Sequence, residues 1–170
     1  MSAKIATATK IDPSTIKQTF STIELNVHCC RYWKLKEWEY TNMSFPFWRL
    51  YYNTLPGASV SFKGNKIDLD AHTVLLIPPQ TAFSTSLVRN DTTKGEERFM
   101  GSPLNSTSEL DHLKDFEMID HLFIHFNLGY QLDRIKSSLF QFEVTSLMRE
   151  QLDRVRLNTI NHAIKWTVSE

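Results

Sequence analysis

The sequence lacks long hydrophobic runs, has few glycines and carries no excess of charge, and each absence excludes a class of function. No stretch of the 170 residues approaches the ~18 apolar residues of a membrane-spanning helix, so we expect no membrane partner. Only 5 glycines are present, and they form no loop of the kind that cradles phosphates. Lys and Arg total 19, as do Asp and Glu, which leaves no basic stripe for binding nucleic-acid phosphates.

Cysteine is also scarce. The two cysteines, Cys29 and Cys30, are adjacent, and consecutive residues of a strand point to opposite faces. They are therefore poorly placed to bridge each other, and the chain offers no other partner. The first 12 residues hold no apolar core of signal-peptide length. These features predict reduced thiols and a cytoplasmic location.

The segment from residue 48 to residue 87 is rich in β-branched and aromatic residues that are interrupted by turn signals. The turns are marked by Pro56-Gly57, Gly64-Asn65 and Pro78-Pro79. Strand and turn at this spacing are typical of an antiparallel sandwich or barrel. The strands predicted here are Trp48–Asn53, Ser59–Lys63, Lys66–Leu69, Val74–Ile77 and Ala82–Val88, and further strands are predicted at Ile23–Leu35 and Ile119–Asn127.

Other segments read differently. We expect residues 1–20 to form a flexible arm and Trp38–Pro46 to form a connection between strands. We expect residues 89–117 to form a polar insertion, with a helical turn near Leu110–Phe116. Residues 129–170 predict helices. The first is short and carries Leu132, Ile135 and Leu139 on one face; the second runs from Thr145 or Ser146, as the N-cap, to about Lys165.

Three fragments in order carry a family resemblance: Ile67-Asp68-Leu69 after a hairpin, the apolar run Val74–Pro79 after a turn, and His121–Phe126. Together they resemble the N-terminal ligand-binding domain of AraC-type transcriptional regulators. The resemblance implies a mainly β fold, namely a cupin-like double-stranded β-helix (jelly-roll barrel) over residues 21–128, followed by C-terminal α-helices. Ala71-His72 stands where the family commonly has a glycine.

The resemblance also implies a function. We expect the effector-sensing and dimerisation domain of a bacterial regulator, which binds a small polar metabolite such as a sugar inside the barrel. It would form a homodimer through its C-terminal helices, and it would reach DNA only through a helix-turn-helix domain absent from this chain. On this view the chain is not an enzyme.

Two strands supply candidate ligand-binding residues. In Ile119–Asn127, His121, Phe123 and His125 share one face, which suits a pocket with a few polar groups; the alternative is that the histidines are exposed or satisfied by backbone carbonyls. In Trp48–Asn53, an inward set of Arg49, Tyr51 and Asn53 would suit an oxygen-rich ligand; the alternative is that Arg49 is a surface cation. The resemblance adds Phe83 and Thr85.

A metal site has little support in this sequence. In metal-binding cupins, two or three histidines and a carboxylate converge inside the barrel. Here the early strands hold no histidine, Phe83 stands at a typical ligand position, and His121 and His125 lack a third ligand. We therefore expect no metal and no cofactor. The alternative function is a stand-alone cupin enzyme, such as a sugar isomerase or a metal-dependent oxygenase.

Nucleophilic catalysis is not indicated either. The chain has no Gly-x-Ser-x-Gly motif, and Cys29 beside His28 comes with no evident oxyanion-stabilising element. The predicted second helix carries an apolar stripe that suits either packing on the barrel of its own chain or self-association, and the two are compatible. The residues of that stripe that we assign to dimerisation are Leu147, Gln151, Leu152 and Val155.

Overall fold

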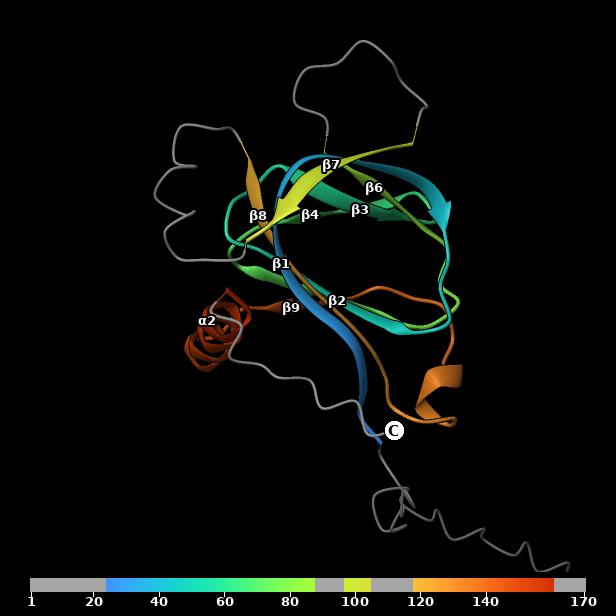
Figure 1. Ribbon diagram of the computed structural model, residues 1–170. Helices are drawn as coiled ribbons and strands as arrows, with labels where there is room; N and C mark the ends of the chain where they lie inside the picture. Colours follow the sequence, from blue (N-terminus) through green and yellow to red (C-terminus); the bar gives the residue numbers. More distant parts are fainter. Residues whose placement is uncertain (1–23, 88–96, 105–117, 161–170) are drawn as a thin grey trace, which may run out of the picture.

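The computed structural model describes residues 24–87, 97–104 and 118–160. Within these ranges, nine antiparallel strands form one curled sheet, and one α-helix lies after them (Figure 1). The mainly β, barrel-like fold with a C-terminal helix is thus confirmed; its finer assignment as a double-stranded β-helix stays a prediction. The expected arm at 1–20, the helical turn near 110–116 and any helix beyond residue 160 lie outside the described residues.

Strand β1, Asn26–Met43, connects the two halves of the sheet. Its first part pairs with β8 and its end pairs with β6, so in Figure 1 it curves from the lower strands up to the upper ones. The sequence predicted a strand ending at Leu35 and then a connection. The strand instead continues, because Trp38 and Tyr40 alternate into the inner core and aromatic residues suit a pleated, half-buried surface.

The other strands follow in a mostly predicted order. The hydrogen-bonded sequence of strands is β4-β3-β6-β1-β8-β2-β5-β9, with β7 paired to β1 outside this path. The bounds are β2 Trp48–Asn53, β3 Ala58–Phe62, β4 Asn65–Leu69, β5 Thr73–Ile77, β6 Phe83–Ser86, β7 Arg98–Pro103, β8 Ile119–Asn127 and β9 Phe140–Glu143.

The turn between β3 and β4 lies one residue earlier than the sequence predicted. Phe62 pairs with Asn65, so the loop consists of Lys63 and Gly64. Their φ angles are 49° and 82°, which fits a two-residue hairpin whose twist matches that of the strands. A positive φ at the second position is the reason for the glycine.

Strand β7 lies inside the predicted polar insertion and was not anticipated. It pairs with β1 from Trp33 to Glu39, and most of its residues are exposed. Gly101 is required by close approach, because a Cβ there would lie 2.6 Å from the Lys34 carbonyl oxygen and 2.8 Å from Leu35 Cδ2.

The sheet is buried on both faces. The inner core contains Leu35, Tyr51 and Leu75, and the outer core lies between the sheet and the helix and contains Tyr52 and Leu122. Strands β2 and β8 supply residues to both cores because successive side chains of a strand point to opposite faces. One face of β2 and β8 therefore belongs to the inner core, and the other face packs in the outer core toward the helix.

Helix α2, Ser146–Ile160, begins where the sequence predicted. The Thr145 hydroxyl accepts a hydrogen bond from the Met148 amide at 3.2 Å, which is the N-cap geometry. The short helix predicted around residues 132–139 is only a 3-10 turn, Leu132–Arg134. Asp133 accepts from the Leu128 amide at 2.9 Å, which fixes the turn, and the chain is already extended at Ile135.

No helix in the described ranges is long and apolar enough to cross a membrane.

Candidate functional site

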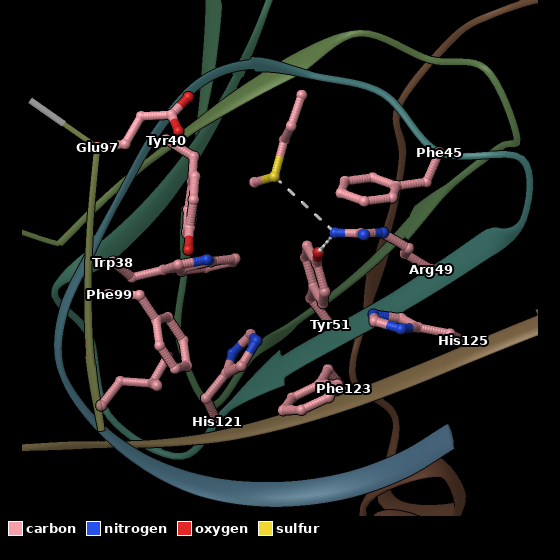
Figure 2. A pocket seen from close by; sticks show the side chains of 12 residues that line it. Trp38, Tyr40, Phe45, Arg49, Tyr51, Glu97, Phe99, His121, Phe123 and His125 are labelled. Carbon is pink, nitrogen blue, oxygen red and sulfur yellow. Dashed lines mark hydrogen bonds between the residues drawn. The ribbon is translucent and has the colours of Figure 1, made fainter. Parts of the chain in front are cut away.

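A cavity of about 420 Å³ lies on the inner side of the sheet. Its walls come from β1 and β7, and β2 and β8 supply the remaining side (Figure 2). Most of the side chains around it carry rings. The lining residues are Leu35, Trp38, Tyr40, Met43, Phe45, Arg49, Tyr51, Glu97, Phe99, His121, Phe123 and His125.

Register brings the two predicted residue sets together. In the antiparallel pairing of β2 with β8, Arg49 lies opposite His125, Tyr51 opposite Phe123, and Asn53 opposite His121. Directly opposed residues share a face of the sheet. The sets Arg-x-Tyr-x-Asn and His-x-Phe-x-His therefore both face inward, and Arg49 is not a surface cation.

Arg49 is a buried cation at the cavity wall, with 7% of its surface exposed. Its Nη1 donates to the Tyr51 hydroxyl at 2.6 Å, and its guanidinium lies 3.5 Å from the centre of the Phe45 ring. Its Nε has no hydrogen-bond partner. Among the described residues no carboxylate forms an ion pair with Arg49; Glu97, the one carboxylate of the lining, is exposed and lies across the cavity in Figure 2.

His121 is held by Asn53. The two are 2.7 Å apart, from ring Nδ1 to side-chain Oδ1, and both are buried. Burial, with a smaller contribution from nearby His125, lowers the pKa of His121 from 6.5 to about 3. The imidazole is therefore neutral at pH 7 and points into the cavity (Figure 2).

His125 lies beside Cys29, with 3.1 Å between ring Nδ1 and Sγ. Burial lowers the pKa of His125 to about 3, and electrostatic interactions with Arg49 and His28 add to that effect. Burial raises the pKa of the Cys29 thiol. Both partners are thus uncharged at pH 7, so this pair supplies no thiolate nucleophile.

In the described ranges, no group of three or more His, Cys, Asp or Glu side chains is arranged to hold a metal ion.

The structure brings together five of the seven predicted ligand-binding residues. Phe83 and Thr85 are the two that it does not place on the cavity wall. Phe83 is buried behind Tyr51, with ring centroids 6.2 Å apart in an edge-on contact, and Thr85 is buried in β6. The strand that carries them was predicted from the residues, but it packs against the core at this point.

Sequence reasoning missed the wall that faces β2 and β8. Trp38, Tyr40 and Phe45 fell in a segment read as a connection, and Phe99 fell in the polar insertion. The density of aromatic residues between residues 38 and 47 was the available signal.

The four residues assigned to dimerisation divide into two pairs. Leu152 and Val155 pack against the outer core of their own chain. Leu147, with 66% of its surface exposed, and Gln151 point away from it. Packing on the barrel therefore accounts for half of the stripe.

No protein-family model and no curated protein matches this chain. Among solved structures it is similar to ToxT from Vibrio cholerae strain SCE256, crystallised with an unsaturated fatty acid bound. The TM-score is 0.44 and the sequence identity 8%, and the match covers 87% of this chain and 50% of the other. This chain thus spans about half the length of ToxT.

Proposed function

We propose that the cavity binds a small organic anion and that the chain is the effector-sensing domain of an AraC-type transcriptional regulator. The observation that carries the binding proposal is Arg49, a buried cation at the cavity wall that no described carboxylate neutralises. The regulatory part rests on the sequence resemblance.

A buried charge without a partner is costly, by several kcal/mol in proteins. The contacts of Arg49 with the Phe45 ring and the Tyr51 hydroxyl offset part of this cost. A ligand carboxylate would offset more, because a guanidinium presents a planar fork of donors that matches a carboxylate. Nε, which has no partner, belongs to that fork.

The rest of the cavity favours an apolar or aromatic body. The rings of Trp38 and Phe99 lie across the cavity from Arg49, and Phe123 lies on the adjoining side (Figure 2); such surfaces bind apolar and planar groups. A neutral sugar would satisfy the hydrogen-bonding groups but would leave the Arg49 charge unmatched. An acid is therefore our first candidate, and a sugar is tested beside it.

A thermal-shift panel of matched pairs tests the proposal: benzoate with benzamide, hexanoate with hexanamide, and gluconate with glucose. At about 100 times the Kd, a ligand adds about 2.7 kcal/mol, so the Tm should rise by about 5–10 °C for a chain of this size. We expect this rise for one or more acids and not for their neutral partners. The rise should disappear in Arg49→Met. Equal shifts for acid and neutral partner, or shifts that survive Arg49→Met, would contradict the proposal.

A regulatory domain must also transmit binding. Strand β8 lies between the cavity and α2, since His121 and Phe123 line the cavity while Leu122 and Ile124 contribute to the outer core with Leu152 of α2. We propose that a ligand biases how α2 packs, and through it a separate helix-turn-helix domain that contacts DNA in the cytoplasm. Hydrogen exchange of α2 amides should slow when ligand is bound; unchanged exchange would sink this coupling.

We also propose that the chain forms a homodimer through α2, using its exposed side. Leu147 and Gln151 are available there, whereas Leu152 and Val155 are covered by their own barrel. In sedimentation velocity, Leu147→Asp should shift a dimer toward monomer, and Lys66→Asp on exposed β4 is the control. A wild-type monomer at high concentration would refute the dimer.

A further inference from the structure

His121 gives the cavity a hydrogen-bond acceptor at a distance from the guanidinium. Its neighbour across the sheet is Asn53, while Arg49 lies opposite His125. The two histidines are four positions apart along β8, which is about 13 Å of extended strand. Since both the guanidinium and the imidazole of His121 point into the cavity (Figure 2), the polar groups mark two ends of one space.

Asn53 sets the tautomer of His121. An amide oxygen can only accept a hydrogen bond, and Oδ1 of Asn53 lies 2.7 Å from Nδ1 of His121, so Nδ1 carries the hydrogen. In a neutral imidazole the other nitrogen, Nε2, is then an acceptor. The lowered pKa of His121 agrees with a neutral ring.

No described residue donates to Nε2 of His121. Around the imidazole stand the rings of Trp38, Tyr51 and Phe123, at centroid distances of 4.6, 5.0 and 5.7 Å. Nε2 is not one of the buried side-chain atoms that lack a partner, and His121 lines the cavity, so a ligand hydroxyl that donates to Nε2 would gain a hydrogen bond in a largely apolar space.

We infer that the cavity is built for an aromatic hydroxy acid: the carboxylate pairs with Arg49, the ring lies between the aromatic walls, and the hydroxyl donates to Nε2 of His121. Asn53 is a positioning residue, because it acts by holding the tautomer. This inference rests on the proposed binding of an organic anion and adds the second polar group of the ligand.

Matched ligands test the inference by calorimetric titration of the whole chain. The probes are benzoate and 2-naphthoate, each with its ring-hydroxylated isomers. We expect at least one hydroxy acid to bind about tenfold more tightly than its parent, since a tenfold change corresponds to 1.4 kcal/mol and a hydrogen bond formed in a protein is worth up to about that much.

Two variants locate the effect. Asn53→Leu combined with His121→Phe removes both hydrogen-bonding partners and leaves no unpaired polar group, so the hydroxy acid and its parent should bind equally. Phe123→Leu, which changes a cavity wall without a polar atom, should weaken both ligands and keep their ratio. A ratio that persists in the double variant overturns the inference, because the hydroxyl is then bound elsewhere.

The outcomes separate the two proposals. If parent acids bind and no hydroxyl improves them, the hydroxyl subsite is wrong and the anion cavity stands. If no acid binds, both are wrong. A further measurement needs neither a ligand nor a variant. In the wild-type protein, the ¹⁵N chemical shifts of the His121 ring should show hydrogen on Nδ1 and none on Nε2; the opposite tautomer overturns the inference.

Discussion

Arg49 and His125 lie directly opposite each other across β2 and β8 and share the wall of the cavity. The guanidinium is one of the causes, after burial, that lower the pKa of His125 to about 3. A ligand carboxylate would therefore meet one positive charge rather than two. Because His125 occupies the position of β8 opposite Arg49, no carboxylate at that position neutralises the Arg49 charge.

Removing the Arg49 charge should not destabilise the protein. Arg49→Met combined with Tyr51→Phe replaces both hydrogen-bonding partners with apolar groups, a change that is often neutral or stabilising. We expect the free energy of unfolding in urea to stay equal or to rise by about 1 kcal/mol, while anion binding is lost. Tyr51→Phe alone leaves Nη1 without its oxygen partner and should lower stability by about 1 kcal/mol. A large loss in the double variant would show that Arg49 is structural.

His121 should make the protein less stable in mild acid. Its folded-state pKa, about 3, lies below the ordinary value of 6.5, so the unfolded chain binds more protons between these values and stability falls as the pH drops from 6.5 toward 3. The loss attributable to His121 is at most about 1.4 kcal/mol per pH unit.

Unfolding measured from pH 6.5 to 4.5 checks this sign. The Asn53→Leu/His121→Phe variant should show a flatter decline than the wild type, whereas His72→Gln, in an exposed turn, should follow the wild type. Parallel declines for wild type and double variant would mean that His121 does not titrate as described.

Asp120 should be essential for stability. Its carboxylate pairs with buried Lys34 and lies 3.6 Å from Arg156 of α2. Asp120→Asn leaves a buried ammonium uncompensated, and we expect a loss of about 3 kcal/mol. Lys34→Met together with Asp120→Leu should recover most of it. The exposed pair Lys66–Asp68, 3.1 Å apart, is the matched control, because Asp68→Asn should cost under about 1 kcal/mol.

Gly101→Ala should weaken ligand binding from outside the cavity. The new Cβ would meet the Lys34 carbonyl oxygen at 2.6 Å, so β7 must shift, and β7 carries Phe99 of the cavity wall. Gly64→Ala is the control: its φ of 82° with open space around it predicts a stability loss of about 1 kcal/mol with unchanged affinity. Equal affinities for both variants would show that β7 does not shape the cavity.

The sequence predicted the part of the site that lies on β2 and β8, because alternate side chains of a strand share a face. His121 could therefore be grouped with His125, and Arg49 with Tyr51, before the inward face of β2 was known. Strand β7 could not be predicted, because its residues are mostly exposed and an exposed strand has no apolar period. The long β1 was cut short because its period-two pattern is broken between Leu35 and Trp38, where its pairing with β7 shifts register.

Phe83 and Thr85 show a different limit. Both were expected at the cavity because of their place in the chain order, and both are buried. Whether a buried residue borders an empty space or fills a core depends on the side chains opposite it, here Tyr51. Periodicity in the sequence predicts which side chains share a face of a strand. Whether that face borders a cavity depends on how strands far apart in the sequence pack against each other.

Because both faces of β2 and β8 are occupied, their pairing tolerates no slip. A shift of one residue would turn Leu122 and Ile124 toward the cavity and His121 and His125 toward α2. Polar rings would then lie in an apolar layer, and Arg49 would face aliphatic side chains. The residues that we propose bind the ligand thus also enforce one alignment of the sheet, so mutations that remove the proposed binding groups would at the same time weaken the preference for one strand register.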